Sequence, residues 1–322
     1  RAVIAHLKND PGAEKAARET ALSNWSQNPR VDFLIGEKLS AKYRFAEVAA
    51  YQRKAREFDP NVVRLNKRAT GFTQDDNGVT LHFTDGTSAS GDMLIGADGL
   101  KSVVRKKLWG DAPATYTGDG AWRIVVPVEK LPKPFLDPVM NVFMGPGGHA
   151  VCYYLRAGAL LNFVGIIETD DISEESWTLK LPWEKLKKDF EGWHPAIQAI
   201  IDAANRDQCY LWSLFNRPPI RVWSTKRATL LGDSAHPTLP YLAQGAAMAI
   251  EDGAVLTRAL GMTDSIAEAL QIYQRNRVDR TAKIVLQSSA NRELFHLPSE
   301  AEIRARFSQR NEGDDRNNWL YS

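Results

Sequence analysis

Residues 227–253 read RATLLGDSAHPTLPYLAQGAAMAIEDG. The apolar run at 228–231 ends at a Gly-Asp pair, which is typical of a short buried strand. Prolines at 237 and 240 then exclude regular structure, and apolar residues after Gly245 recur at spacings of three and four. The stretch therefore predicts a strand, a loop and a helix, in that order.

This strand–loop–helix unit has features of a ligand-binding site. Gly245 lets the backbone approach a ligand closely, and the helix that follows offers unpaired amides and the positive end of its dipole. Asp233 lies just past the strand, where its carboxylate can accept hydrogen bonds from ligand hydroxyls. An ordinary strand–helix connection with an aspartate in the turn has the same spacing, so both interpretations stay open at this point.

The stretch resembles the second FAD-binding segment of the class A flavin-dependent aromatic hydroxylases, the salicylate hydroxylase-like family. In that family a Gly-Asp pair holds the ribityl chain of the flavin, and a Pro-x-x-x-Gln-Gly-Ala segment passes the flavin ring. The residues to which the resemblance gives a role in FAD binding are Gly232, Asp233, Pro240, Gln244, Gly245 and Ala246.

A second motif of this kind lies upstream, at residues 96–105 (GADGLKSVVR). A buried strand is predicted at 93–95, and a helix is predicted after the turn, up to Trp109. The motif resembles the Asp-Gly-x-x-Ser-x-x-Arg segment that the family associates with FAD and the pyridine nucleotide. The resemblance implies cofactor-binding roles for Asp98, Gly99, Ser102 and Arg105. The alternative for Arg105 is a surface cation on a helix.

The glycine-rich fingerprint that normally opens members of this family is absent from residues 1–60. That fingerprint seats the FAD pyrophosphate on a helix N-terminus. Either the chain is shortened or rearranged at its N-terminus, or the ADP half of FAD is held differently. The looser match at 145–150 (GPGGHA) precedes a strand pattern, and Pro146 lacks an amide proton, so we interpret it as a hairpin turn.

Periodicity predicts the remaining elements. Alternation at 79–84 followed by Asp-Gly predicts a half-buried strand and a hairpin turn. Further strands are predicted at 1–5, 31–35, 62–65, 122–126, 139–144, 151–155 and 160–167, and helices at 13–26, 45–58, 183–191, 195–204 and 266–295. We expect an α/β fold: a Rossmann-like FAD/NAD(P)-binding domain of the glutathione reductase type (1–114 and 226–322), an inserted mixed β-sheet substrate domain (115–225) and a helical C-terminus.

The inserted sheet carries the candidate catalytic residues. Ala-Trp-Arg at 121–123 matches an aromatic-Arg strand of the family, and in some fungal relatives this arginine and a later tyrosine bind and deprotonate the phenol. The resemblance points to Arg123 and Tyr153, with Tyr154 as the neighbouring alternative. A cation lowers the pKa of a phenol, and a phenolate is the better nucleophile. The competing interpretation is an arginine in a salt bridge at the sheet edge and a tyrosine in the core.

The flavin loop carries two more candidates for the substrate pocket, His236 and Tyr241. A histidine titrates near neutral pH and can act as a base or proton relay. His236 also fits a role in ordering the loop through backbone hydrogen bonds, and we favour that role. Tyr241 belongs to the same loop and is expected to line the pocket.

Composition narrows the class of protein. The chain has 322 residues, a net charge of +2, 43% hydrophobic and 25% charged residues, which is ordinary for a globular protein. The sequence contains no block of basic residues of the kind that binds nucleic acid, and no run of about 18 apolar residues that would predict a membrane span. The first residues do not resemble a signal peptide. Cys152 and Cys209 lack metal-site spacing, so we expect no metal and a reduced, cytoplasmic location.

The resemblance implies an FAD-dependent monooxygenase. NAD(P)H would reduce the flavin, O2 would form a flavin C4a-hydroperoxide, and one oxygen atom would pass to a small aromatic substrate. Salicylate or a hydroxybenzoate is the expected substrate class, followed by hydroxynicotinate-like rings, and the C-terminal helices are the candidate region for homodimer contacts. The alternative is a shortened paralogue with weak or no FAD binding that acts as a non-catalytic binding protein. A nicotinamide dehydrogenase is disfavoured, because no intact dinucleotide fingerprint is present.

Overall fold

The computed structural model describes residues 15–16, 64–110, 112, 114–133, 135–170 and 179–308. The elements predicted at 1–5, 31–35 and 45–58 lie outside these residues, as does the helix at 13–26 except for the helical pair 15–16. The chain divides into two compact units, Arg1–Arg68 and Ala69–Ser322, and the second contains all the elements named below. None of the helices in the described ranges combines the length and apolar character needed to cross a bilayer.

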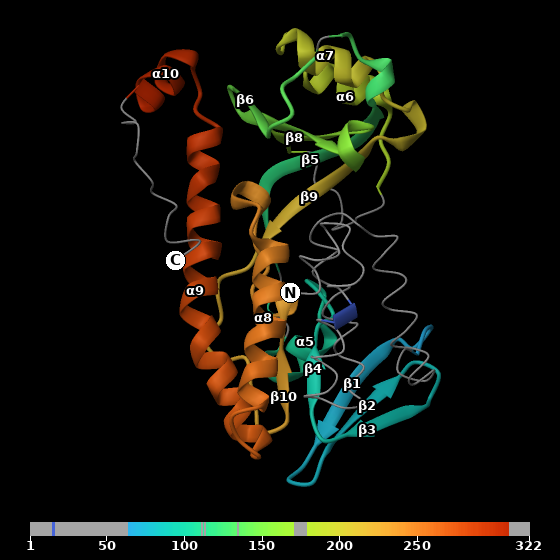
Figure 1. Ribbon diagram of the computed structural model, residues 1–322, viewed down its shortest axis with the longest axis vertical. Helices are drawn as coiled ribbons and strands as arrows, with labels where there is room; N and C mark the ends of the chain where they lie inside the picture. The colour runs from blue at the N-terminus through green and yellow to red at the C-terminus, as the bar shows by residue number, and fades with distance from the viewer. Residues whose placement is uncertain are drawn as a thin grey trace. The chain divides into compact units, whose positions relative to one another are not determined.

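A small antiparallel sheet opens the second unit (Figure 1). Its strands are β1 (Ala69–Gln74), β2 (Val79–Phe83) and β3 (Ser88–Gly91). The predicted strand at 79–83 is confirmed, and the turn after it contains Gly86 at φ 78°. The strand predicted at 62–65 is wrong for Arg64 and Leu65, which form no strand. Leu65 is 72% exposed, and pairing begins at Ala69, where the register with β2 buries Phe72.

The strands of the two sequence motifs lie side by side. β4 (Leu94–Gly96) pairs in parallel with β10 (Ala228–Leu230), so both motif loops leave the same edge of this two-stranded sheet. Gly96 is required here, because a Cβ atom would lie 2.7 Å from the Cβ of Val104. The first loop leads to helix α5 (Val103–Trp109), and the second leads through the short turns η4 (Gly232–Ser234) and η5 (Pro240–Leu242) to helix α8 (Gly245–Leu260).

Between the two motifs the chain forms a five-stranded sheet in the order β6-β7-β8-β5-β9. Its strands are β5 (Thr115–Pro127), β6 (Asn141–Gly145), β7 (Gly148–Leu155), β8 (Leu160–Glu168) and β9 (Tyr210–Asn216). All of their pairings are antiparallel, whereas the sequence predicted a mixed sheet. Hairpins join β6 to β7 and β7 to β8, and connections this short impose antiparallel pairing. The pattern did not predict β9.

One face of this sheet packs against two helices, α6 (Trp183–Asp189) and α7 (Pro195–Asp202). Trp122, Phe163 and Leu211 from the sheet, with Phe190 and Ile200 from the helical segment, are fully or almost fully buried in this core. Residues 145–148 form the predicted hairpin turn, since Gly145 pairs with Gly148. The short helices of this region are η1 (Val128–Lys130), η2 (Arg156–Gly158) and η3 (Arg206–Gln208).

The long helix α9 (Ile266–Phe295) has the predicted bounds and packs alongside α8 (Figure 1). The Ser265 hydroxyl caps its first turn by accepting from the amide of Glu268 at 3.3 Å. Tyr273 anchors the helix to the motif strand, donating to the carbonyl of Leu230 at 3.0 Å. A short helix, α10 (Glu300–Ser308), follows. The domain boundaries proposed at residues 114 and 226 stay a prediction.

Candidate active site

A cavity of about 630 Å³ lies between the two motif loops and one face of the five-stranded sheet. This volume is typical of a small-molecule site. The predicted site residues that line it are Gly99, Arg123, Tyr153, Gly232, Asp233, Pro240, Gly245 and Ala246. Segments more than 100 residues apart in the sequence therefore bring most of the predicted residues to one site.

The motif loops present bare backbone to the cavity. Gly99 and Gly232 have φ values of 76° and 67°, a conformation that favours glycine. A Cβ atom on Gly232 would lie 3.3 Å from the Cβ of Ala249. Gly245 and Ala246 open helix α8, whose first amides have no acceptor within the helix. The site thus offers backbone donors and a helix N-terminus to a ligand.

Asp233 also lines the cavity, at the turn after β10. Burial raises the pKa of its carboxyl group, and the nearby His236 partly counters this effect. Asp233 is nonetheless an exposed residue that borders the cavity. A carboxylate so placed can accept hydrogen bonds from ligand hydroxyls, and its contact with the ribityl chain stays a prediction.

Asp98 and Ser102 do not line the cavity; they cap helix α5. Asp98 accepts from the hydroxyl of Ser102 at 2.6 Å and from the amide of Val103 at 2.7 Å. Ser102 in turn accepts from the amide of Arg105 at 2.8 Å. These linked capping hydrogen bonds hold the turn that presents Gly99 to the cavity.

Arg105 is buried, which contradicts the alternative of a surface cation. Its guanidinium donates to the carbonyls of Ser234 and Ala235 at 3.1 and 3.2 Å. Burial and the positive charge of Arg217 lower the pKa of Arg105. The side chain therefore ties the first motif to the loop of the second.

Arg123 and Tyr153 face the cavity from β5 and β7. The guanidinium of Arg123 lies over the ring of Trp212, 4.6 Å from its centroid, and its buried Nε has no hydrogen-bond partner among the residues that the structure describes. Burial lowers the pKa of Arg123, and Tyr153 has the opposite effect. Tyr154 is on the other face of β7, where its hydroxyl donates to the carbonyl of Leu136 at 2.9 Å.

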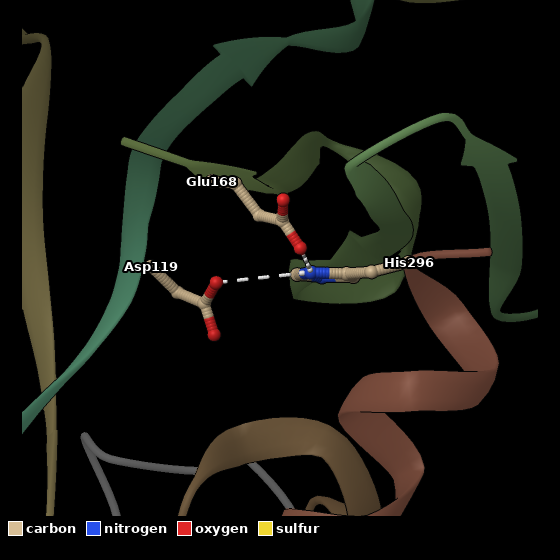
Figure 2. Close-up of side chains that lie close together, drawn as sticks. All are labelled: Asp119, Glu168 and His296. Atoms are coloured by element: carbon tan, nitrogen blue, oxygen red, sulfur yellow. Dashed lines mark hydrogen bonds and ion pairs between the residues drawn. The ribbon is translucent and has the colours of Figure 1, made fainter. Parts of the chain in front are cut away.

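Tyr241 is buried next to the cavity and is not among the side chains that line it. Its hydroxyl donates to Asp119 at 2.6 Å. Asp119 in turn lies close to Glu168 and His296 (Figure 2). Gln244, the residue before α8, is also buried and does not line the cavity.

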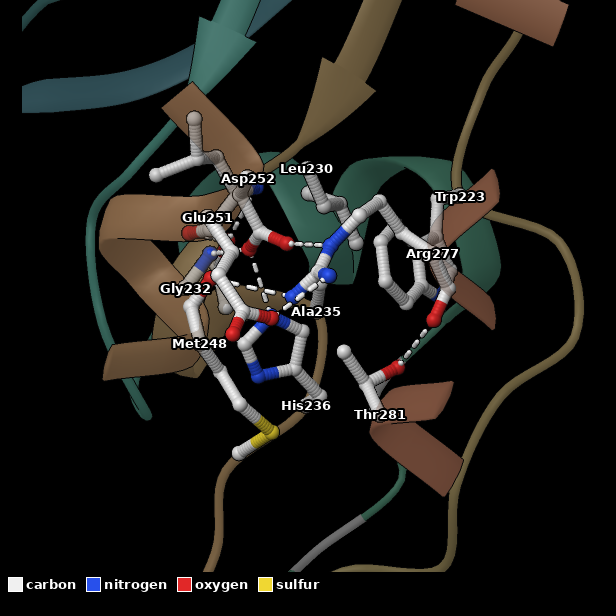
Figure 3. Close-up of polar contacts among 12 residues, drawn as sticks. Trp223, Leu230, Gly232, Ala235, His236, Met248, Glu251, Asp252, Arg277 and Thr281 are labelled. Carbon is white, nitrogen blue, oxygen red and sulfur yellow. Dashed lines mark hydrogen bonds and ion pairs between the residues drawn. The ribbon is translucent and has the colours of Figure 1, made fainter. Parts of the chain in front are cut away.

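His236 belongs to a buried network around Asp252, away from the cavity lining (Figure 3). Its Nε2 lies 2.5 Å from the Asp252 carboxylate, which also accepts from the amide of Gly232 at 2.9 Å and from Arg277 Nε at 2.7 Å. Burial alone would raise the pKa of Asp252, but the hydrogen bonds from His236, Gly232 and Arg277 outweigh it and lower the pKa. The contacts fit a loop-ordering role for His236, because they hold the Gly232 turn against α8 and α9.

Sequence reasoning missed His149. It lies on β7 and lines the cavity together with Val151 and Tyr153. Alternate residues of a strand share a face, so the assignment of Tyr153 to the site already implied His149. Trp212, which stacks on Arg123, was missed because β9 was not predicted.

Comparison with known proteins agrees with the two motifs. A family model described as "FAD binding domain" matches residues 9–288. The 3-amino-4-hydroxybenzoate 2-monooxygenase of Streptomyces platensis is 35% identical over 272 residues, covering 84% of this chain and 68% of that enzyme. The 3-hydroxybenzoate 6-hydroxylase of Polaromonas naphthalenivorans is 39% identical over 231 residues, covering 71% of this chain and 56% of that enzyme. These names support an enzyme rather than a non-catalytic binding protein.

Solved structures show the same relationship. HpxO of Klebsiella pneumoniae, solved with FAD and uric acid, is 29% identical with a TM-score of 0.69, covering 82% of this chain and 66% of that one. A salicylate hydroxylase solved with its substrate shares the fold at 24% identity and a TM-score of 0.68, covering 85% of this chain and 72% of that one. The chain belongs to the FAD-binding class A flavoprotein aromatic hydroxylases.

Proposed function

We propose that the FAD of this family lies along the two motif loops of the cavity. The residues fit this cofactor in three ways: bare backbone at Gly99 and Gly232, a carboxylate at Asp233, and amides at the start of α8 that have no acceptor within the helix. Asp233 would accept hydrogen bonds from the ribityl hydroxyls. The amides of Gly245 and Ala246 would favour negative charge on the flavin ring, as helix N-termini do.

We infer that the enzyme hydroxylates a hydroxy-aromatic acid with NAD(P)H and O2. FAD, when bound, supplies the activation of oxygen and its transfer to the ring. The chain binds the substrate, orients it and excludes water. Apolar side chains such as Val164, Ile166 and Leu214 line the cavity beside a few polar groups, which suits an aromatic ring.

The observation that carries this proposal is the buried Nε of Arg123, for which the described part of the chain supplies no acceptor. A buried donor left without an acceptor costs about 1–3 kcal/mol, so an anionic ligand oxygen placed there would be stabilised. Arg123 would bind either the carboxylate or the ionising phenol of the substrate, and a cation next to a phenol lowers its pKa. Tyr153, on the same face of the five-stranded sheet, would contribute a hydroxyl to the same ligand.

The direct test is a screen of the FAD-loaded protein with 3-hydroxybenzoate, salicylate and 6-hydroxynicotinate. We expect at least one of them to stimulate NAD(P)H oxidation and to be hydroxylated. Arg123→Gln should weaken binding of that acid by about tenfold or more, the loss of one charge-assisted hydrogen bond. Phenol, which lacks the carboxylate, is the control that shows which oxygen Arg123 holds. The proposal is contradicted if none of these acids binds or stimulates oxidation.

The homodimer and the cytoplasmic location stay predictions from the sequence. Size-exclusion chromatography with light scattering on the FAD-loaded protein tests the first, and fractionation of the source cells tests the second.

A further inference from the structure

A charged cluster lies where strands β5 and β8 meet the end of helix α9 (Figure 2). Asp119 is fully buried, whereas 47% of the Glu168 side chain is exposed to solvent. Arg292 bridges the two carboxylates, reaching Asp119 at 2.6 and 2.8 Å and Glu168 at 3.2 Å. His296, only 2% exposed at its side chain, faces both carboxylates through its Nδ1.

The cluster is connected to the cavity through His149. That side chain lines the cavity, and its Nδ1 lies 3.2 Å from Nε2 of His296. The other ring nitrogen of His296, Nδ1, lies 3.3 Å from Oε1 of Glu168. Two buried imidazoles therefore join the cavity to a carboxylate that reaches solvent.

The Glu168 carboxylate determines which ring nitrogens of His296 and His149 carry a proton. An ionised carboxylate can only accept, so Nδ1 of His296 carries a proton and its Nε2 does not. Nε2 of His296 must then accept from Nδ1 of His149. A neutral imidazole carries one proton, so Nε2 of His149, a side chain that lines the cavity, is left as an acceptor. Burial and the neighbouring His296 lower the pKa of His149 to about 3, which keeps the ring neutral at physiological pH.

We propose that His149, His296 and Glu168 form a proton outlet through which a phenol bound in the cavity loses its proton to solvent. The inference rests on the proposed function, since it needs a hydroxy-aromatic ligand. The phenol O–H bond breaks and its proton bonds to Nε2 of His149. The Nδ1 proton of His149 passes to Nε2 of His296, and the Nδ1 proton of His296 passes to Glu168, which releases it to water.

Proton count is conserved along the outlet. Each imidazole gains one proton and loses one, and the phenol becomes a phenolate as one proton enters solvent. Neither ring has to hold a positive charge at rest, which burial would oppose. Return of a proton along the same path, to the oxygen anion of the product, restores both original tautomers.

The remaining groups that face His296 position it and do not carry the proton. Arg292, on its own helix, occupies both oxygens of Asp119 and partly neutralises Glu168. Burial and the Asp119 carboxylate raise the pKa of Tyr241 far above its usual value, so its hydroxyl stays protonated and donates to Asp119. Asp119 lies 3.7 Å from Nδ1 of His296, farther than Glu168, and it is sealed from solvent.

The first test reads the tautomers without any catalysis. Nitrogen-15 NMR of histidine-labelled, FAD-loaded protein should show His149 and His296 neutral and protonated at Nδ1 near neutral pH. Glu168→Gln should change the His296 signals, because an amide can also donate to Nδ1. A proton on Nε2 of either His149 or His296 in the wild type would overturn the proposed proton outlet.

The second test follows the proton itself. A pH indicator in weak buffer reports proton release when FAD-loaded protein is mixed with 3-hydroxybenzoate in a stopped-flow instrument. Glu168→Gln and His296→Gln should slow this release by about 100-fold, the lower end of what positioned proton transfer contributes, with an unchanged Kd. Asp170→Asn makes the same change of charge at an exposed site two residues beyond Glu168 and should leave the rate unchanged.

The outcomes separate the two proposals. Wild-type rates in both Gln variants, with 3-hydroxybenzoate bound and ionised, overturn the proton outlet and leave the proposed function standing. If no hydroxy-aromatic acid binds the wild type, the proposed function fails. The tautomers measured by NMR still decide whether His149, His296 and Glu168 are hydrogen-bonded in the predicted order.

Discussion

The guanidinium of Arg105 donates to the backbone carbonyl of Ser234 at 3.1 Å, and this bond joins two motifs that are 129 residues apart. A second bond reaches the carbonyl of Ala235 at 3.2 Å. The two cofactor motifs are therefore one structural unit, in which the first fixes the loop of the second. Damage to either motif should disturb the other.

Arg105→Met should lower the free energy of unfolding by about 3 kcal/mol, because two buried carbonyls lose a charged donor. Urea denaturation of the variant measures this change. Lys107→Met is the control, since Lys107 is exposed on the same helix and its loss should cost less than about 0.5 kcal/mol. Equal effects of the two substitutions would contradict the structural role of Arg105.

Asp252→Asn should lower the free energy of unfolding by about 3–5 kcal/mol at neutral pH, because it removes the fully buried carboxylate that contacts both His236 and Arg277 and leaves Arg277 paired with the partly exposed Glu251. The pKa of Asp252 is lowered, so its stabilisation is present above the unfolded-state value of about 3.9 and is lost as pH falls through the folded-state value. The difference between wild type and variant should therefore be largest above about pH 4 and narrow on acidification. Urea titrations across this range measure it, and a difference that does not depend on pH would refute the assignment.

Gly232→Ala should destabilise the protein by about 1–2 kcal/mol, because the residue has a φ of 67°, where a side chain is strained. It should also weaken FAD binding, since the turn presents its backbone to the cavity. Gly253→Ala is a matched control in helix α8, where the new Cβ would meet no described atom within 4 Å beyond its chain neighbours and the adjoining helix backbone. That substitution should stabilise by about 0.5–1 kcal/mol, through higher helix propensity. Stabilisation by both substitutions would be inconsistent with the described turn.

Asp233→Ala should reduce flavin retention after gel filtration, measured as visible absorbance per mole of protein. The reason is the loss of a carboxylate that faces the cavity. Because burial raises the pKa of Asp233, wild-type retention should weaken on acidification at a higher pH than for an ordinary aspartate. Asp264→Ala, at an exposed position, is the control. Unchanged flavin occupancy in Asp233→Ala would remove the proposed ribityl contact.

Local pattern was enough to predict much of the fold. The bounds of α9 follow from its helical periodicity, and the β2 strand from its alternation. The strand predicted at 62–65 failed because hydrophobicity alone does not define pairing, and the register of β1 with β2 begins at Ala69. β9 was missed although it pairs with β5 in the sheet behind the cavity.

The sequence predicted which residues lie at the site more accurately than it predicted what each of them does. The motif residues Asp98 and Ser102 belong to the same loop as Gly99, but they act as helix caps, which only the contacts reveal. His236 was placed near the flavin loop, yet its partner Asp252 comes from a helix whose packing no local pattern predicts. His296 lies 147 residues from His149, and nothing in the sequence pairs them.

Product analysis with isotopically labelled O2 would show whether the enzyme inserts an oxygen atom into an aromatic ring. FAD-loaded protein is given NAD(P)H, labelled O2 and the hydroxy-aromatic acid that it binds, and the product is weighed by mass spectrometry. We expect one labelled oxygen atom in a newly hydroxylated ring if the proposed monooxygenase activity is correct. Unmodified acid recovered from a protein that has bound both flavin and ligand would contradict it.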